Sequence, residues 1–259
     1  MVITSATQEV LVVGYPKSGN TWLTRLVAEL INCPVKGFFE QPNNPEISIE
    51  GSTRQSNYVV FKGHQSFDKI CQKIQHNNLI YVVRNVHDVA VSGANFFEFY
   101  PTNLVNKVIC KSPILGDLYY RQTFISEKGK IRKMIRTLDK GDSSVPWCQI
   151  PWDEHIIPYL TNGVLVIKYE DLLANPEVEC QKILSHIGIN RSGQQMREAI
   201  KNQSFGTIKE KFKSNNQKKH EAFLREGKSG GWKQKLTVKQ QKFLTNRFFD
   251  TLNSLGYLD

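Results

Sequence analysis

The chain has 259 residues, of which 40% are hydrophobic, and this is enough for one sizeable α/β core. Its formal net charge is +10, and most of the excess lies in residues 209–242, where eleven Lys and Arg stand against three Glu and the net charge is +8. The start of the chain lacks the charged and apolar parts of a secretory signal, and no run of 18 apolar residues occurs, so we expect a soluble, cytoplasmic protein without a membrane span.

The cysteines and histidines indicate neither a disulfide framework nor a metal site. The five cysteines are odd in number and widely spaced, and no C-x-x-C pair occurs, so we expect reduced and mostly buried thiols. The six histidines show no H-E-x-x-H or similar spacing, and we expect no structural metal ion. The cysteines are Cys33, Cys71, Cys110, Cys148 and Cys180.

The first informative segment is an apolar run at 10–13 that breaks into a loop rich in Gly and Pro. An amphipathic helical pattern follows the loop. Because the first N–H groups of a helix have no partner within the helix, Gly19, Asn20 and Thr21 are predicted to bind a phosphate. The loop nearly fits the nucleotide-binding pattern G-x-x-x-x-G-K-[ST], but Asn20 stands in the lysine position and the charge lies at Lys17 instead. The apolar stripe of the predicted helix is Leu23, Leu26, Val27 and Leu30.

Further short apolar runs predict the other strands of the core. They lie at 58–61, 79–83 and 164–167, and continuous β-branched runs of this length are typical of strands buried on both faces. Helical patterns separate them, which favours a mostly parallel sheet with ligands at the carboxyl ends of its strands. The remaining expectations are a helix over 112–138, a loop over 141–151, a helix from Asn175-Pro176 to about His186, a polar, Lys-rich stretch over 206–231 whose order the sequence leaves open, and a final helix over 238–255 with Phe243, Leu244, Phe248 and Leu252 on its apolar face.

Two constellations follow predicted strands. The first is F-K-G-H at 61–64, where His64 has a side-chain type suited to accepting a proton near neutral pH, although a lone histidine is more often a packing residue. The second is R-N-V-H-D-V-A-V-S at 84–92. Arg84 and Ser92 are predicted to reach one phosphate, while a salt bridge from Arg84 to Asp88 is the simpler interpretation of the same residues.

The string P-K-S-G-N-T-W at 16–22, together with these two constellations, resembles the motifs of the cytosolic-type sulfotransferases. Those enzymes move a sulfuryl group from 3′-phosphoadenosine 5′-phosphosulfate (PAPS) to an alcohol or amine. The resemblance implies that His64 is the general base, that Lys62 assists at the transferring group, and that Arg84 and Ser92 bind the 3′-phosphate. It also implies donor binding by the loop residues Lys17, Ser18, Gly19, Asn20, Thr21 and Trp22.

Three later segments resemble the rest of the donor site of that family. Y-E-D at 169–171 implies that Tyr169 binds the adenine, and Q-S-F at 203–205 implies that Ser204 assists the 3′-phosphate while Phe205 stacks on adenine opposite Trp22. R-E-G-K-S-G-G-W-K at 225–233 implies a 3′-phosphate role for Arg225 and Gly227. This segment departs from the family pattern, because Glu226 replaces a lysine and Gly231 replaces an aspartate.

The resemblance implies a single sulfotransferase domain over 1–259 with a three-layer, P-loop-like α/β fold, a mostly parallel central sheet and flanking helices. A basic lid over about 206–231 would close on PAPS, and the product would be adenosine 3′,5′-bisphosphate (PAP). We expect in-line displacement at sulfur, with Lys17 stabilising the charge that develops on the bridging oxygen and with no metal ion. Lys242 stands where the dimer motif of the family has glutamate, so we expect a monomer or weak homodimer.

The expected partner is a small-molecule acceptor, with neither nucleic acid nor membrane. Two other functions remain open at this point: a P-loop kinase or nucleotide hydrolase, which would need magnesium and ATP, and a non-catalytic basic module that binds nucleotides or nucleic acid with a steep salt dependence. The acceptor itself is not identified, because loops that set specificity do not reveal it in their sequence. The candidate acceptor loops are 38–56, 96–104 and 141–151.

Overall fold

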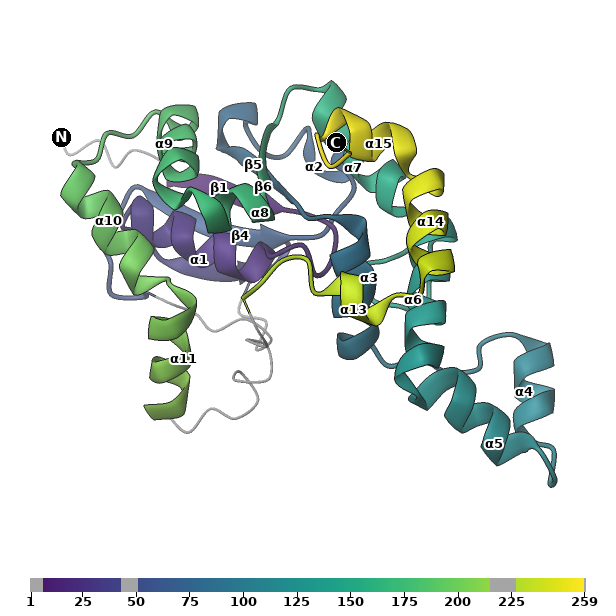
Figure 1. Ribbon diagram of the computed structural model, residues 1–259. Coiled ribbons are helices and arrows are strands. Elements are labelled where there is room, and N and C mark those ends of the chain that lie inside the picture. The colour runs from purple at the N-terminus through teal and green to yellow at the C-terminus, as the bar shows by residue number, and fades with distance from the viewer. Residues whose placement is uncertain (1–6, 43–50, 215–226, 259) are drawn as a thin grey trace. The chain divides into compact units, whose positions relative to one another are not determined.

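The computed structural model describes residues 7–42, 51–214 and 227–258 (Figure 1). The chain divides into two compact units. The first unit comprises Met1–Gly14, Gly19–Val83 and Tyr159–Lys228, and the second comprises Tyr15–Ser18, Arg84–Pro158 and Ser229–Asp259.

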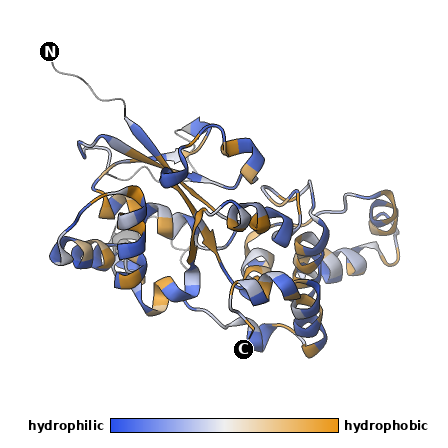
Figure 2. Cartoon of the chain, turned by 90° about the horizontal axis from the view of Figure 1, so that it is seen from above, coloured by the Kyte–Doolittle hydropathy of each residue, from blue (hydrophilic) through white to orange (hydrophobic). Residues whose placement is uncertain are grey.

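The first unit contains a six-stranded sheet in the order β3-β2-β4-β1-β5-β6. All neighbouring strands are parallel except β2 and β3, which are antiparallel. The predicted α/β class with a mostly parallel central sheet flanked by helices is therefore confirmed, and the central strands are largely hydrophobic (Figure 2). The strands are β1 (Gln8–Val13), β2 (Val35–Phe38), β3 (Gln41–Pro42), β4 (Tyr58–Gly63), β5 (Leu79–Val83) and β6 (Leu165–Lys168).

The predicted apolar runs became β1, β4, β5 and β6, whereas β2 and β3 were not predicted. β2 has four residues and β3 has two, and Lys36 and Gly37 interrupt the apolar pattern of β2. Such short segments carry too little periodicity to be recognised without their partner strand.

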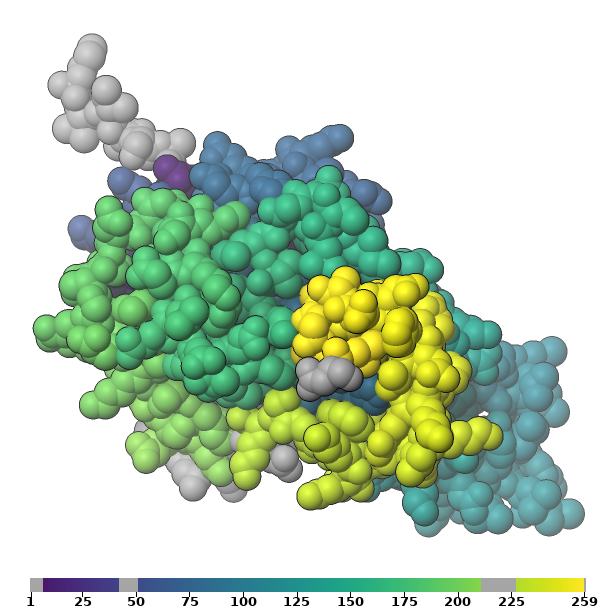
Figure 3. Space-filling model, turned by 45° about the horizontal axis from the view of Figure 1, so that its top comes forward, coloured from purple at the N-terminus to yellow at the C-terminus, as the bar shows by residue number. Residues whose placement is uncertain are grey.

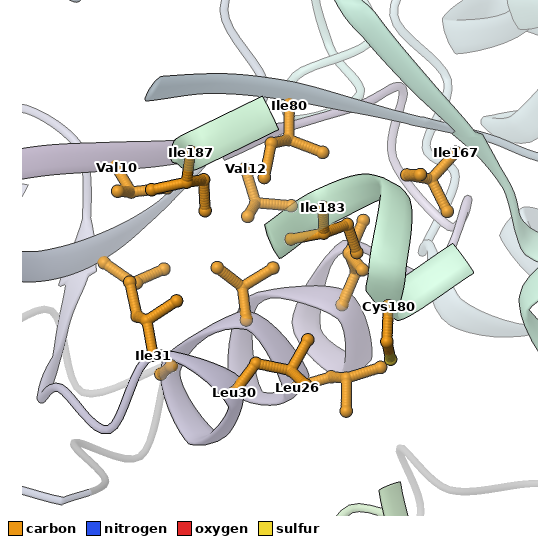
Figure 4. Packing of buried hydrophobic residues seen from close by; sticks show 14 of the residues in the cluster. Val10, Val12, Leu26, Leu30, Ile31, Ile80, Ile167, Cys180, Ile183 and Ile187 are labelled. Atoms are coloured by element: carbon orange, nitrogen blue, oxygen red, sulfur yellow. The ribbon is translucent and has the colours of Figure 1, made fainter. Parts of the chain in front are cut away.

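One face of the sheet packs against α1 and α9 (Figure 4). Val10, Val12 and Ile80 alternate with residues of the opposite face, and they meet Leu26 and Leu30 of α1 in one buried cluster. The predicted stripe of α1 is confirmed, since all four of its apolar residues are buried. The helices of this unit are α1 (Asn20–Leu30), α2 (Phe67–Ile70), η1 (His76–Asn78), α8 (Tyr169–Ala174), α9 (Pro176–Ile187), α10 (Gly193–Asn202) and α11 (Phe205–Ser214).

The opposite face carries Tyr81, whose ring centroid lies 4.4 Å from that of Tyr159. Phe67 of α2 meets Tyr159 edge-on at 5.3 Å. Tyr159 lies in α7 (Trp152–Thr161), the helix within which the two units divide. As predicted, α9 begins at Pro176 after Asn175, because proline fits the first position of a helix.

The second unit is helical around α3. Gly93 of α3 lies against Met134 of α6, where an added Cβ would stand 2.6 Å from the Met134 Sδ, so a larger residue at position 93 would require the Met134 side chain to move. The helices of this unit, besides the part of α7 up to Pro158, are α3 (Val86–Phe96), α4 (Leu104–Cys110), α5 (Gly116–Tyr120), the π-helical turn η2 (Arg121–Ile125), α6 (Glu127–Lys140), α13 (Trp232–Lys235), α14 (Val238–Arg247) and α15 (Phe249–Ser254).

Two predicted segments differ from the structure. The helix predicted over 112–138 is divided, because Ser126 is extended and its side chain caps the start of α6 by accepting from the Gly129 N–H. The final helix is divided at Phe248, and Phe243 is 44% exposed rather than buried. In the stretch over 206–231, whose order the sequence leaves open, residues 206–214 belong to α11, and residues 215–226 lie outside the described residues.

All five cysteines are free, as expected, but Cys71 is exposed and Cys110 is half-buried. Burial raises the pKa of the thiols of Cys33, Cys148 and Cys180 to about 12, so these three stay protonated and unreactive at neutral pH. Within the three described ranges, no helix is both long and apolar enough to cross a bilayer.

Candidate functional site

The glycine at the start of α1 is required by the geometry of the loop. Gly19 caps the helix with φ at 103°, in the left-handed region, and an added Cβ would stand 2.6 Å from the Cδ2 of Tyr169. The helix therefore begins abruptly, with the N–H groups of Asn20, Thr21 and Trp22 in its first turn. These groups have no carbonyl partner within the helix, and N–H groups in this position are donors of the kind that bind anions.

The Asn20 side chain holds two strand ends together. Its Nδ2 donates to the Gly14 carbonyl at 2.9 Å and to the Gly63 carbonyl at 3.2 Å, joining the ends of β1 and β4 to α1. Asn20 is 2% exposed. The residue in the lysine position of the nucleotide-binding pattern is thus a buried amide that shapes the loop, and only its backbone N–H remains for an anion.

His64 is held in one tautomer by the same strand ends. Its Nδ1 lies 2.7 Å from the Gly14 carbonyl oxygen, which can only accept, so Nδ1 carries the proton and Nε2 is the basic nitrogen of the neutral ring. The Nδ2 of Asn20 lies 3.4 Å from the same Nδ1; since both groups donate, this contact is no hydrogen bond in that tautomer. The arrangement leaves His64 suited to accept a proton at Nε2.

Gln65 fixes the backbone that carries His64. Its Oε1 accepts from the His64 N–H at 3.0 Å, and its Nε2 donates to the Phe39 carbonyl at 3.3 Å. The Tyr159 hydroxyl donates to the Gln65 carbonyl at 2.7 Å, and burial raises the pKa of Tyr159 well above its usual value, which keeps this donor protonated. Sequence reasoning missed both residues; only the position of Gln65 directly after His64 could have indicated one of them.

Lys62 precedes Gly63 in β4, and its side chain reaches the start of α1. Its Nζ donates to the Thr21 hydroxyl at 3.0 Å and lies 4.7 Å from the centroid of the Phe38 ring. Lys62 is 8% exposed. A buried ammonium beside the N-terminal turn of α1 adds positive charge to this end of the helix, where low solvent exposure strengthens electrostatic interactions.

The predicted adenine-binding aromatics form part of the same unit. Trp22 and Tyr169 meet edge-on at 5.6 Å, and the Trp22 Nε1 donates to the Gln203 carbonyl at 2.8 Å. An added Cβ on Gly227 would stand 2.7 Å from the Cδ2 of Phe205, so these two predicted site residues are neighbours.

Ser204 has a local role that sequence reasoning did not assign. It lies directly before α11, its hydroxyl is 2.9 Å from that of Thr207, and it accepts from the Thr207 N–H at 3.4 Å, so it caps that helix. Arg225 lies outside the described residues.

In the second unit, Asp88 and Ser92 lie four residues apart on α3 and so share one face of that helix, while Arg84 precedes its N-cap residue Asn85. The Arg84 Nη2 lies 3.9 Å from the Asp88 Oδ1, at the limit of an ion pair. The other oxygen, Asp88 Oδ2, accepts from the Ser229 hydroxyl at 3.1 Å and from the Gly230 N–H at 2.8 Å. Asp88 thus anchors residues 229–231, called the glycine-rich segment, to α3. The sequence did not reveal this role.

His87 contacts residues of α13 and α14, which follow the glycine-rich segment. Its Nε2 lies 3.1 Å from the Gln241 carbonyl and 3.2 Å from the Thr245 hydroxyl, and its ring stacks on Trp232 at 4.4 Å. Burial lowers the pKa of His87, which favours the neutral ring at physiological pH. His87 and Asp88 together attach α13, α14 and the glycine-rich segment to the first turn of α3.

We expect Asp88→Ala to lower the free energy of unfolding by about 1–3 kcal/mol, because two partly buried hydrogen bonds to a carboxylate are lost. Asp88→Asn keeps one acceptor oxygen and should cost less than Asp88→Ala. Asp117→Ala removes an exposed ion pair with Arg121 and should change the stability by less than about 1 kcal/mol. Urea unfolding measures all three; an Asp88→Ala protein as stable as Asp117→Ala would contradict the anchoring role.

Two loop residues of the second unit precede Gly19. Lys17 has φ at 72°, and its Nζ lies 3.7 Å from the centroid of the Phe96 ring, a cation–π contact. Ser18 is fully buried, and its hydroxyl has no hydrogen-bond partner within the described ranges. A buried hydroxyl without a partner is costly unless a ligand supplies one, so this loop fits a bound anion.

The family model described as sulfotransferase domain matches residues 7–256. Sulfotransferase 6B1 of Mus musculus is 29% identical over 262 residues, covering 96% of this chain and 78% of the relative. Sulfotransferase 1 family member D1 of Mus musculus is 24% identical over 263 residues, covering 91% of this chain and 80% of the relative.

Two solved structures show the same fold. Mouse sulfotransferase SULT7A1 complexed with PAP aligns with a TM-score of 0.64 and 19% identity, covering 96% of this chain and 84% of that chain. Retinol dehydratase in complex with androsterone and inactive cofactor PAP aligns with a TM-score of 0.56 and 17% identity, covering 96% and 81%.

Proposed function

Because the chain belongs to the sulfotransferase family, we propose that it transfers a sulfuryl group from PAPS to a hydroxyl or amine of a small-molecule acceptor and releases PAP. The relatives are sulfotransferases, and two neighbouring structures were solved with PAP, which supports this donor. Neither the kinase or hydrolase function nor a non-catalytic nucleic-acid module gains support from these relatives.

The observation that carries the proposal is the tautomer of His64. Because Nδ1 donates to the Gly14 carbonyl, Nε2 can remove the proton from the hydroxyl or amine of the acceptor molecule. The oxygen or nitrogen of that group attacks sulfur at the same time. The new bond to sulfur forms as the bond from sulfur to the bridging oxygen breaks, and PAP leaves with that oxygen. Lys62, beside the N-terminal turn of α1, and Lys17, in the preceding loop, are the cations proposed to stabilise charge on the transferring group and on the bridging oxygen.

The remaining predicted residues are proposed to bind the donor. The first N–H groups of α1 and the Ser18 hydroxyl would hold the 5′ end, while Trp22, Tyr169 and Phe205 would contact the adenine. Arg84, which precedes α3, and Ser92, which lies on it, would bind the 3′-phosphate. By the family resemblance, Ser204, Arg225 and Gly227 would assist there. No group of three or more His, Cys, Asp and Glu residues suited to a metal ion occurs in the part of the chain that the structure describes, and the proposed mechanism has no metal-dependent step.

PAP should bind at least about 100-fold more tightly than adenosine 5′-monophosphate, because two charge-assisted hydrogen bonds to the 3′-phosphate are each worth about 1.5–3 kcal/mol. Isothermal titration calorimetry with both ligands measures the ratio. Equal affinities would refute the assignment of a 3′-phosphate site, and tight magnesium-dependent binding of ATP would refute the donor.

The acceptor can be identified without a prior guess of its structure. The protein is incubated with PAPS and a fractionated metabolite pool, and mass spectrometry then finds the compound that gains one sulfuryl group. A heat-treated sample of the same protein is the control.

We also propose a monomer or weak homodimer, since the exposed Lys242 occupies the position of the glutamate in the dimer motif.

A further inference from the structure

The hairpin of α4 and α5, together with η2, exposes an unusual number of large apolar side chains. They lie within a stretch of 22 residues of the second unit, from 104 to 125, which Figure 3 shows in blue-teal at the surface. Soluble proteins expose single apolar residues routinely, but a contiguous group indicates an interaction surface. The group, called the apolar tip below, is Leu104, Val105, Val108, Ile114, Leu115, Leu118 and Ile125, each between 54% and 87% exposed.

Residues outside the apolar tip make contacts within the hairpin and η2. The Tyr119 hydroxyl donates to the Asn106 Oδ1 at 2.7 Å and so joins α5 to α4. Gly116 lies so close to the Cys110 carbonyl that an added Cβ would stand 2.4 Å from its oxygen. Phe124, which is fully buried, stacks on Tyr120 at 5.6 Å. These contacts are made by residues outside the apolar tip, whose own side chains remain exposed.

The charges around the apolar tip are predominantly positive. Five basic residues between 101 and 132 are exposed, against two exposed acids. Both acids are engaged: Asp117 pairs with Arg121 at 2.9 Å, and Glu127 pairs with Lys235 at 2.9 Å. The basic residues are Lys107, Lys111, Arg121, Lys128 and Arg132.

From this combination we infer that the apolar tip docks on anionic lipid membranes, with its apolar side chains in the interfacial region and the surrounding lysines and arginines at the lipid headgroups. Apolar insertion and basic residues at the headgroup level are the two terms that bind peripheral proteins to such membranes. A second copy is the less favourable occupant, because it would bring two positively charged rims together. The expectation of no membrane partner rested on the lack of an apolar span, which does not bear on an interfacial surface.

The test is co-sedimentation of the full-length protein with vesicles of phosphatidylcholine alone or with 30% phosphatidylserine. We expect the protein to bind the anionic vesicles at least about tenfold more tightly than the neutral ones, and to lose most of this preference in 0.5 M salt. Ile114→Ser/Leu118→Ser and, separately, Lys107→Glu/Lys111→Glu should each weaken binding to anionic vesicles by about tenfold or more.

Two matched control variants lie on the exposed part of α14 and at its start. Val238→Ser removes an apolar side chain that is 66% exposed, and Lys239→Glu/Lys242→Glu reverses two exposed charges; both should bind anionic vesicles within about twofold of the unchanged protein. Thermal unfolding confirms that each variant is folded. Equal binding to both vesicle types, or test variants that bind like the controls, would overturn the proposal. A dimer in sedimentation that Ile114→Ser/Leu118→Ser dissociates would also overturn it and identify a second copy as the occupant.

Discussion

Replacement of His64 by Ala is expected to lower kcat by about two to four orders of magnitude, the usual contribution of a positioned general base. The loss follows from removal of Nε2, the nitrogen left basic by the hydrogen bond from Nδ1 to the Gly14 carbonyl. The affinity of the variant for PAP should stay within a fewfold of that of the unchanged protein. The reason is that the proposed base removes a proton from the acceptor molecule and does not hold the donor. Initial rates with PAPS and the identified acceptor, together with calorimetric titration of PAP, separate the two effects.

His64→Asn is the matched control for structure. Its amide can still donate to the Gly14 carbonyl and so preserve the contact between the ends of β1 and β4, but it supplies no base. We expect His64→Asn to be about as inactive as His64→Ala and closer to the unchanged protein in stability. If either variant retains turnover within a fewfold, His64 does not act as the base.

Arg84→Ala is expected to weaken PAP binding by about 100-fold or more, since a guanidinium contributes two charge-assisted hydrogen bonds to a phosphate. The affinity for adenosine 5′-monophosphate should be almost unchanged, because that ligand lacks the 3′-phosphate that Arg84 is proposed to hold. Arg84→Lys keeps the charge but not the planar fork, so it should recover only part of the loss. Ser92→Ala removes one neutral donor and should cost about tenfold at most.

This comparison also distinguishes a binding role from a structural one. Arg84 lies 3.9 Å from Asp88, which anchors Ser229 and Gly230, so a purely structural Arg84 would affect both nucleotides alike. An equal loss of affinity for PAP and adenosine 5′-monophosphate would therefore remove Arg84 from the 3′-phosphate site.

Local sequence determined the main features of the fold. The β-branched runs at 10–13 and 79–83 became neighbouring parallel strands, because a strand buried on both faces must be apolar throughout. The stripe containing Leu26 and Leu30 became the buried face of α1, because a period of 3.6 residues places those side chains together. The prediction of one helix over 112–138 was wrong, because Ser126 is extended and caps the start of α6. The sequence did not reveal this break, because a serine is also tolerated inside a helix.

The candidate site depended more on the tertiary structure. The sequence by itself placed Lys62, His64 and Arg84 at strand ends, and the motif resemblance assigned their roles. Only the folded chain decided which tautomer His64 adopts, because its Nδ1 meets the carbonyl of Gly14, fifty positions away in the chain.

The same holds for the residues that the sequence did not single out for these roles. The hydrogen bond from Tyr159 to Gln65, beside His64, joins residues 94 positions apart in the chain. The hydrogen bond from Gly230 to Asp88 joins residues 142 positions apart. Hydrogen bonds between such distant positions leave no periodic signal in a single sequence, because they form only when separate elements pack together. The sequence therefore determined the strands, the loop before α1 and the candidate chemistry, while tertiary packing decided the orientation of His64 and the anchoring of the glycine-rich segment.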